Sequence, residues 1–322
     1  MKPAISVVMK SYNHAPYVAQ SIASILDQSF ADFEIVISDD GSTDGTPEII
    51  RGFSDPRIRF MSFEENSGIA AAMNSATVRA AGEFIAILNS DDFALPGRLA
   101  AQVAFLRQHD EIAAVFGLPR QVGEDGETTL GFEPFETPFI GAHYPRQAWL
   151  RHLFFHGNCL CAPTAMIRRS AYADIGNDDR RLTNLHDLDR WVRLLERFDI
   201  YVLPDELTAF RVRADGRNAS APSRASYLRA PFECFQIFKR YRHLAPEFLR
   251  EIFAEDLERH GIDASGRAGV WLAEVALTGT QAWHPLYALD TLFEAAGDDR
   301  AFRRLAELTG TLNVLRLPDQ VE

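Results

Sequence analysis

The sequence predicts an α/β fold in which a mostly parallel sheet carries helices on both faces and a helical region follows towards the C-terminus. Over residues 4–116, short apolar segments rich in β-branched residues alternate with segments of helical periodicity. From about residue 220 only helical periodicity remains. Hydrophobic residues make up 47% of the 322 residues, enough for a sizeable core. We therefore expect a domain over residues 1–219, divided near residue 117, and a helical appendage over residues 220–322.

The elements of the first half follow from local patterns. Apolar runs that end in turn-forming residues predict buried strands at residues 4–9, 33–38, 57–63, 83–88 and 112–116. Apolar residues at helical spacing, a proline in the first turn or an alanine-rich composition predict helices at residues 17–28, 47–52 and 68–81, and from Pro96.

In the second half the rhythm changes. The same patterns predict a hairpin at 119–133, strands at 164–167, 201–203 and 210–212, and an amphipathic helix at 186–198. The C-terminal helices are expected near 225–241, 246–260, 268–278 and 285–309.

Composition narrows the class of protein. The formal net charge is −12, which argues against nucleic-acid binding because that function needs basic patches. Three cysteines (Cys159, Cys161 and Cys234) cannot all pair within one chain, and their scarcity fits a reducing cytoplasm. There is neither a signal-peptide pattern nor a stretch of ~18 apolar residues, so no membrane span is expected. These observations predict a cytoplasmic protein, with peripheral association at the inner membrane face as a second option.

Two polar segments follow the first two predicted strands. In residues 11–17, Tyr12 and Asn13 have the groups needed to stack on and hydrogen-bond a nucleobase. In residues 39–46, a carboxylate at the strand end suits a base N–H or ribose hydroxyls, and Gly41 and Gly45 permit a tight loop. Taken singly, residues 11–17 are better explained as an ordinary strand-to-helix turn with asparagine as a cap, and residues 39–46 are also explained by a variant of the capping box.

The adjacent carboxylates Asp91 and Asp92 follow the predicted strand at 83–88. Neighbouring carboxylates repel each other unless a cation or hydrogen-bond donors offset their charge. Divalent Mg²⁺ and Mn²⁺ take oxygen ligands, commonly shared between protein carboxylates and substrate phosphates. The carboxyl end of a strand is also where open α/β sheets bind ligands. A metal site and a solvated turn explain this pair about equally well on its own.

A further acidic pair, Asp187 and Asp189, lies on the predicted helix at 186–198. Successive helical residues advance by about 100°, so the two carboxylates cannot point the same way. Asp189 precedes Arg193 by four residues, which predicts a surface ion pair. Asp187 is therefore the better catalytic candidate, although an acid at a helix start is also favoured by the helix dipole.

The order and spacing of all these motifs resemble the inverting family 2 glycosyltransferases, whose GT-A fold is Rossmann-like. The resemblance covers residues 3–213 and is carried by Ser11, Tyr12 and Asn13; Phe33–Asp44; Asn66 and Gly68; Ala81–Ile85; Asp91 and Asp92; and Pro96, Arg98 and Leu99. It implies that residues 1–117 bind a nucleotide sugar and that residues 118–219 form an acceptor half.

The resemblance also implies roles for single residues. Donor-binding residues would be Ser11, Tyr12, Asn13, Asp39, Asp40, Asn66, Gly68, Asn74, Asn89, Asp91, Arg211 and Arg213. Asp91 and Asp92 would hold Mn²⁺ or Mg²⁺, and Asp187 would be the general base.

Several positions depart from the family pattern. Asn89 replaces the first acid of the metal motif, and Met73 stands where an arginine is usual. His186 replaces the first residue of an acidic pair. An arginine stands where a histidine is frequent in the closing strand, so Arg211 or Arg213 would hold the diphosphate as a fixed cation.

These motifs predict a metal-dependent inverting transferase that moves sugar from a nucleoside diphosphate sugar, most simply a UDP-sugar, to a hydroxyl of a glycan, lipid-linked or protein acceptor. The alternatives are a nucleotidyltransferase and a non-catalytic sugar-nucleotide-binding assembly subunit. Apolar stripes in the C-terminal helices suit self-association or acceptor positioning as well as plain internal packing. A membrane-surface role is less favoured because acids are mixed with the basic residues.

Overall fold

The structure, a computed structural model, describes residues 2–128, 144–213 and 224–310. The described chain forms two compact units, one comprising residues 1–153 and 158–227 and the other comprising residues 154–157 and 228–322. The predicted boundary between residues 219 and 220 lies outside the described residues.

The first unit is built on one eight-stranded sheet in the order β3-β2-β1-β4-β7-β6-β8-β5. Its strands are β1 (Ile5–Ser11), β2 (Phe33–Asp39), β3 (Ile58–Ser62), β4 (Phe84–Asn89), β5 (Phe93–Ala94), β6 (Ile112–Val122), β7 (Met166–Arg168) and β8 (Asp199–Arg211). The four strands β3, β2, β1 and β4 are parallel, whereas β7 runs antiparallel to both β4 and β6. The sheet is thus parallel in its first half and mixed in its second.

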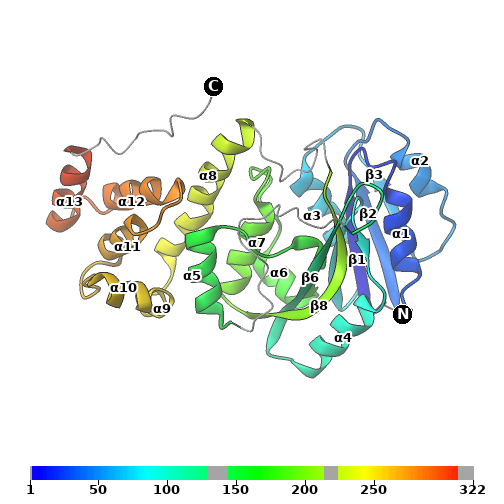
Figure 1. The fold of residues 1–322 in the computed structure, drawn as a ribbon, viewed down its shortest axis with the longest axis horizontal. Coiled ribbons are helices and arrows are strands. Elements are labelled where there is room, and N and C mark those ends of the chain that lie inside the picture. The colour runs from blue at the N-terminus through cyan, green and yellow to red at the C-terminus, as the bar shows by residue number, and fades with distance from the viewer. Residues whose placement is uncertain (1, 129–143, 214–223, 311–322) are drawn as a thin grey trace. The chain divides into compact units, whose positions relative to one another are not determined.

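Helices cover the sheet on both faces. They are α1 (Val18–Leu26), α2 (Thr46–Arg51), α3 (Ile69–Arg79), α4 (Arg98–Gln108), α5 (Arg146–His156), α6 (Arg169–Ile175) and α7 (His186–Leu195). Figure 1 shows α1 and α2 on one side of strands β1 to β3 and α3 on the other. Strand β1 is buried along nearly its whole length, as expected for a parallel strand covered on both faces.

Two predicted strands of the second half turn out to be one. The segments expected at 201–203 and 210–212 belong to the single strand β8, which pairs with β6 through several register shifts. Proline and two acids interrupt the apolar pattern at residues 204–206, so the local sequence reads as a break. The predicted turn at 124–126 is present, because Gly126 N donates to Gly123 O (3.0 Å).

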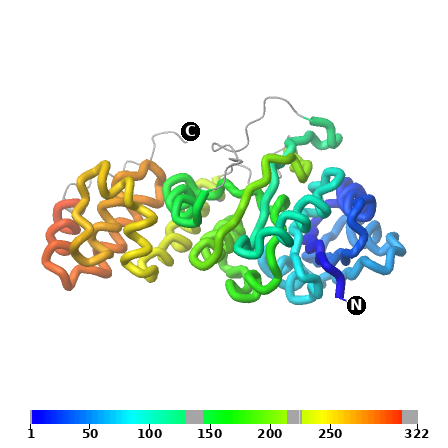
Figure 2. Tube along the Cα trace, turned by 90° about the horizontal axis from the view of Figure 1, so that it is seen from below, coloured from blue at the N-terminus to red at the C-terminus, as the bar shows by residue number. Residues whose placement is uncertain are grey.

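The second unit is helical. It contains most of α8 (Arg224–Phe238), then α9 (Pro246–Ile252), α10 (Ala254–His260), α11 (Ala268–Leu277), α12 (Trp283–Glu294) and α13 (Asp299–Gly310). Figure 2 shows the helices from α9 to α13 stacked in succession. The helix expected at 246–260 is divided at Phe253, and the one expected at 285–309 is divided between α12 and α13.

An aromatic cluster forms the core of this second unit. Phe154 is fully buried, and its ring centroid lies 5.1–5.4 Å from those of the surrounding rings, which belong to Phe238, Tyr241, Phe253, His284 and Tyr287. Trp283 Nε1 also donates to Phe154 O (3.0 Å). Offset and edge-to-face ring pairs of this kind add stability beyond the burial of apolar area. The last turn of α5 is therefore an integral part of the helical unit.

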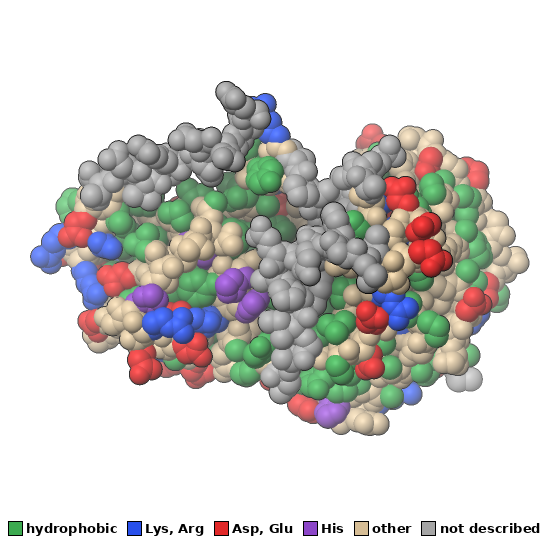
Figure 3. Space-filling model, viewed as in Figure 1, with side chains coloured by type: hydrophobic (Ala, Val, Ile, Leu, Met, Phe, Trp, Pro, Cys, Tyr) green, Lys and Arg blue, Asp and Glu red, His purple; other side chains and the backbone are tan. Residues whose placement is uncertain are grey.

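The surface of the helical unit carries both signs of charge. Figure 3 shows acidic and basic side chains interspersed on its visible face. Among the described helices, none is long and apolar enough to cross a membrane.

Candidate active site

The loop after β1 is fastened to the loop after β2. Asn13 N donates to Ser42 Oγ (2.8 Å), and Thr43 N donates to Asn13 Oδ1 (2.9 Å). Asn13 has a φ of 52°, a left-handed conformation that asparagine tolerates better than most residues. Its neighbour Tyr12 is 43% exposed, so its ring can stack on a ligand. The predicted turn is thus a structural joint that presents Tyr12.

Asp39 and Asp40 shape the same loops. Asp39 accepts hydrogen bonds from Ser42 N (2.9 Å), Ser42 Oγ (2.6 Å) and Ser62 Oγ (3.1 Å), while Asp40 accepts from the backbone N–H groups of Ser67 (2.7 Å) and Gly68 (3.0 Å). A carboxylate offers about four lone-pair positions. Asp39 is fully buried and Asp40 is 4% exposed, so both carboxylates mainly organise these loops.

The neighbouring glycine explains how the loops approach each other. Gly41 has a φ of +72°, and a Cβ at this position would lie 2.6 Å from the backbone carbon of Glu65. Only glycine fits here without moving the chain. Asn66, which is exposed, and Gly68 follow Glu65 in the loop after β3. The predicted donor-binding loop that contains Gly41 therefore lies beside the one that contains Asn66 and Gly68.

The two adjacent carboxylates after β4 have different surroundings. Asp92 is buried and accepts hydrogen bonds from Arg211 N (2.8 Å) and Asn89 Nδ2 (2.9 Å). Burial, followed by repulsion from Asp91, raises the pKa of Asp92 well above its ordinary value. Asp91 Oδ2 instead lies at longer distances from His14 Nε2 (3.6 Å) and Arg213 (3.7 Å). Asp92 is thus tied into the loop, and Asp91 offers the more accessible oxygens.

The two candidate arginines differ in the same way. Arg211 is 1% exposed. Its guanidinium group donates to four oxygens: the backbone oxygens of Asp91, Gly123 and Glu124, and Oε1 of Gln20. It also lies 4.7 Å from the ring centroid of Tyr17. Arg213 instead places its guanidinium group beside the Asp91 carboxylate. Arg211 thus holds the loops together, and Arg213 is the arginine that lies next to the Asp91 carboxylate.

This contrast gives a prediction about stability. Arg211→Ala should lower the free energy of unfolding by about 3 kcal/mol or more, because four neutral oxygens lose their donor and each unsatisfied buried group costs about 1–3 kcal/mol. Arg213→Ala should change stability less and should mainly weaken nucleotide binding. Urea unfolding and calorimetry with UDP measure the two effects. Equal losses of stability in both variants would contradict this assignment.

Asp187 lies in the first turn of α7. Its carboxylate accepts from Asn158 Nδ2 (2.9 Å) and from Leu188 N (2.9 Å). Burial raises the pKa of Asp187 above that of an ordinary carboxyl group, while Lys10 and then Arg190 act in the opposite direction. A carboxylate with a raised pKa is a better proton acceptor.

The prediction that Asp189 lies on the solvent face is wrong. Asp189 is 7% exposed and pairs with Arg193 Nε at 2.8 Å, and Arg193 also donates to the carbonyl oxygens of Ile175 and Gly176. The loop before α7 covers this side of the helix, which helical periodicity alone could not reveal. The pair is structural and buried.

Asn74 also fastens that loop. Asn74 Nδ2 donates to Asp178 O (2.9 Å), and Asp178 N donates to Asn74 Oδ1 (2.8 Å). The Asp178 carboxylate in turn binds Arg190. The predicted donor-binding residue Asn74 therefore links α3 to the segment that leads into α7.

Lys10 and His186 are site residues that the sequence analysis did not assign. Lys10 Nζ lies 3.3 Å from His186 Nε2. Burial lowers the pKa of Lys10, and the charges of Asp187 and Asp91 act in the opposite direction with a smaller effect. The sequence signal for Lys10 is weak, because a lysine that follows an apolar strand is also common at a solvated strand end. Ser11 is one of the predicted donor-binding residues, and its Oγ is buried with no hydrogen-bond partner among the described residues.

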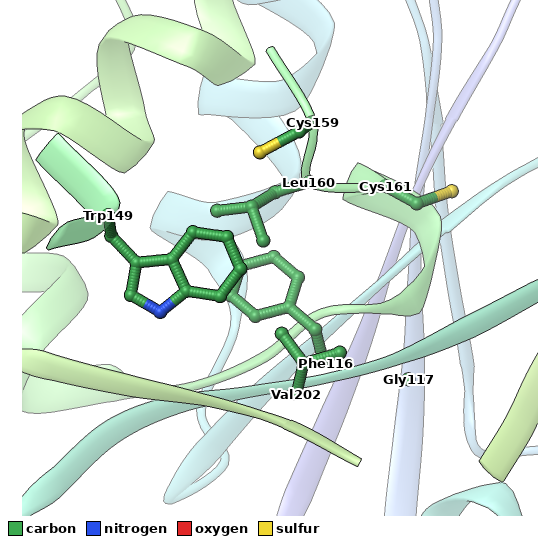
Figure 4. Close-up of a pocket in the computed structure, with 7 residues that line it drawn as sticks. All are labelled: Phe116, Gly117, Trp149, Cys159, Leu160, Cys161 and Val202. Atoms are coloured by element: carbon green, nitrogen blue, oxygen red, sulfur yellow. The ribbon is translucent and has the colours of Figure 1, made fainter. Parts of the chain in front are cut away.

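A cavity near α5 is too small to hold a substrate. It has a volume of about 10 Å³, room for one water at most, and is lined by Phe116, Gly117, Trp149, Cys159, Leu160, Cys161 and Val202 (Figure 4). The two cysteines are free thiols, and burial raises the pKa of each. Their prediction as buried small apolar residues fits this position.

Known proteins resemble this chain in sequence and in fold. A glucosyltransferase of Escherichia coli, the UDP-Glc:alpha-D-GlcNAc-diphosphoundecaprenol beta-1,3-glucosyltransferase WfgD, is 36% identical over 113 residues, or 35% of this chain and 44% of that protein. The structure of S. aureus TarS 1-349 in complex with UDP-GlcNAc aligns with a TM-score of 0.60 at 20% identity, covering 96% of this chain and 92% of TarS.

A second structure, the mannosyltransferase PcManGT from Pyrobaculum calidifontis in complex with GDP-Man and Mn²⁺, aligns with a TM-score of 0.55 at 20% identity, covering 96% of this chain and 85% of that one. These alignments confirm the predicted GT-A fold. The profile of glycosyl transferase family 2 matches residues 6–176, more than half of the chain. The chain therefore belongs to glycosyltransferase family 2.

Proposed function

We propose that this glycosyltransferase is metal-dependent and inverting, and that it transfers a sugar from a nucleoside diphosphate sugar to a hydroxyl of a glycan, lipid-linked or protein acceptor in cell-surface polysaccharide or glycoconjugate synthesis. The observation that carries the proposal is the meeting of three strand ends at one edge of the sheet. Strands β2, β1 and β4 are neighbours and run parallel. Asp39, Tyr12 and Asp91 lie at or just after their carboxyl ends, and therefore at the same edge of the sheet.

The residues present fit a divalent cation. Among the described residues, no cluster of three or more acidic, histidine or cysteine side chains could hold a metal by itself. Mg²⁺ and Mn²⁺ in nucleotide sites need only one or two carboxylates, because phosphates complete the coordination. Asp91 supplies accessible oxygens, and Asn89 Oδ1 is buried with no hydrogen-bond partner among the described residues. A cation held there would neutralise charge on the departing diphosphate.

The residues of this chain would then perform the remaining steps. Arg213, beside Asp91, would bind the diphosphate, and Tyr12 with Asp39 and Asp40 would position the base and ribose. Asp187 would accept the proton of the acceptor hydroxyl as that oxygen attacks the anomeric carbon. Attack opposite to the leaving group inverts the configuration in a single displacement.

UDP is the nucleotide we favour. TarS binds UDP-GlcNAc and WfgD is named for UDP-Glc, whereas PcManGT binds GDP-Man. Calorimetry with UDP and GDP, each with and without Mn²⁺, tests this choice. We expect tighter binding of UDP that is lost on chelation of the metal. Release of free UDP on incubation with a donor and an acceptor indicates transfer, whereas pyrophosphate would indicate a nucleotidyltransferase. Binding of nucleotide without turnover of any donor would favour a binding subunit.

The helical unit carries an apolar groove that suits self-association. The groove has a volume of about 350 Å³ and is lined by Phe235, Leu286, Leu289, Asp290, Phe293 and Leu305. Phe293 is 72% exposed, and Leu228 and Phe232 are exposed on α8. An exposed apolar surface of this kind is typical of an interface.

We therefore expect the wild-type protein to sediment as a dimer or larger species and Phe293→Glu to sediment as a monomer. Val78→Glu is the matched control, because Val78 is equally exposed (72%) but lies on α3 of the other unit. A monomer in all three proteins would leave the helical unit with a role in acceptor positioning or structural support.

A further inference from the structure

Asn158 lies in the loop between α5 and the short 3₁₀ helix Ala162–Thr164, and its side chain contacts Asp187 in the first turn of α7. Asn158 Nδ2 donates to Asp187 Oδ2 (2.9 Å), and Asn158 Oδ1 accepts from Leu160 N (3.2 Å). A backbone N–H group can only donate, so the oxygen of the amide faces Leu160 and its NH₂ group faces Asp187. The orientation of the Asn158 amide is thus fixed by the chain itself.

The Asp187 carboxylate receives one donor on each of its oxygens. Leu188 N donates to Oδ1 (2.9 Å), and the Asn158 amide donates to Oδ2. The torsion that turns a carboxylate about its Cβ–Cγ bond has only broad preferences, so a carboxylate held at a single oxygen can rotate. Donors on both oxygens fix its plane and leave lone-pair capacity for a further donor, such as a hydroxyl group. Asp187 is only half-buried, so that capacity can be used.

The segment that follows Asn158 is anchored to two other elements of the same unit. Thr164 O accepts from Gln102 Nε2 on α4 (2.7 Å), and Pro163 O accepts from Thr208 Oγ1 on β8 (3.1 Å). A side chain can hold a reactive group in a defined geometry only if its own support is rigid. Asn158 therefore projects from a segment that is fixed by hydrogen bonds at its other end.

We propose that Asn158 is a positioning residue for Asp187: its amide, acting with the backbone N–H group of Leu188, fixes the plane of the carboxylate that accepts the proton of the acceptor hydroxyl. The inference rests on the proposed function, because that function makes Asp187 the general base. Asn158 neither gains nor loses a proton in the reaction and acts only through Asp187. A misoriented base loses part of its contribution to turnover, while the donor loops are untouched.

Two substitutions of Asn158 separate this role from plain support of the loop. Asn158→Ala removes both hydrogen bonds and should lower kcat on the order of tenfold with little change in the donor KM, a smaller loss than removal of the base itself. Asn158→Asp keeps the oxygen that accepts from Leu160 N but sets a second carboxylate against Asp187 Oδ2, so it should lower kcat at least as much. A residue that only supported the loop would give the opposite order, with Asn158→Asp active and Asn158→Ala impaired.

Thr164→Val is the matched control in the same segment. It removes the hydrogen bond from Thr164 Oγ1 to Cys161 O (2.7 Å), while Thr164 N still donates to that oxygen (3.0 Å). We expect a lower melting temperature and an unchanged kcat. A loss of turnover equal to that in Asn158→Ala would show that turnover requires the loop as a whole and not the Asn158 amide.

A double-mutant cycle provides a second kinetic readout. Once Asp187→Asn has removed the base, Asn158→Ala should cost nothing more, so the double variant should turn over as slowly as Asp187→Asn alone. The same tenfold loss on top of Asp187→Asn would overturn the proposal, because effects that are independent multiply.

Nuclear magnetic resonance can detect the contact without any turnover. In the full-length protein with ¹⁵N-labelled asparagine, Asn158→Asp removes one pair of side-chain amide signals and so identifies it. Asp187→Ala should shift this pair, because its carboxylate acceptor is lost, whereas Asp189→Ala on the same helix should leave it in place. An Asn158 pair that does not respond to Asp187→Ala would overturn the proposal.

The failure of the proposed function would look different. Full activity of Asp187→Asn would refute the assigned base, while the response of the Asn158 signals to Asp187→Ala would still be observed. The two failures are thus distinguishable.

Discussion

Asp187→Asn should lower kcat by about 10²-fold or more and leave the KM for the donor nearly unchanged, because it removes a general base without touching the donor loops. The substitution preserves shape, but the amide has a single oxygen, so it can keep the hydrogen bond from Asn158 Nδ2 or the one from Leu188 N, which bind different oxygens of the carboxylate. Steady-state kinetics with a donor and a matching acceptor measure the effect, and calorimetry with UDP checks that donor binding persists.

The control for this substitution is Asp189→Asn on the same helix. Asp189 forms a buried pair with Arg193, so its loss should lower the free energy of unfolding by up to about 3 kcal/mol while the folded protein keeps its turnover. If Asp189→Asn abolished turnover and Asp187→Asn did not, the wrong carboxylate would have been assigned as the base.

Asp91→Asn should weaken Mn²⁺-dependent binding of UDP on the order of 10²-fold, because the accessible carboxylate of the acidic pair is neutralised. Its carboxylate oxygens lie 3.6 Å from His14 and 3.7 Å from Arg213, so we expect little change in thermal stability. Calorimetry with UDP, repeated with a chelator, measures the metal-dependent part of the affinity directly.

Asp92→Asn is the informative comparison, because Asp92 is also a predicted metal ligand. Its carboxylate accepts from Asn89 Nδ2, and an amide rotated to accept from Arg211 N would set two NH₂ groups against each other. We expect Asp92→Asn to lower the melting temperature as well as the affinity. An unchanged effect of the chelator in Asp91→Asn would contradict the role assigned to Asp91.

Local patterns were sufficient for much of the fold. The apolar runs at residues 4–9 and 33–38 became β1 and β2, because a buried parallel strand needs little more than a short β-branched run bounded by turns. Long-range pairing decided the rest. β8 remains one strand through residues 204–206 because β6 supplies a partner along most of its length, and no local signal records that partner.

The sequence by itself determined which carboxylates of the candidate site lie at or just after the ends of strands. Asp39, Asp40 and Asp91 follow directly from strands, and parallel strands end at one edge, so their proximity needed no knowledge of distant contacts. The tertiary structure alone decided what each charged group does. Arg211 and Arg213 are two residues apart, yet one is enclosed by carbonyl oxygens and the other lies beside Asp91. Lys10 and His186 meet across 176 positions of sequence. The electrostatic environment of a side chain depends on groups brought together by folding, which spacing along the chain does not encode.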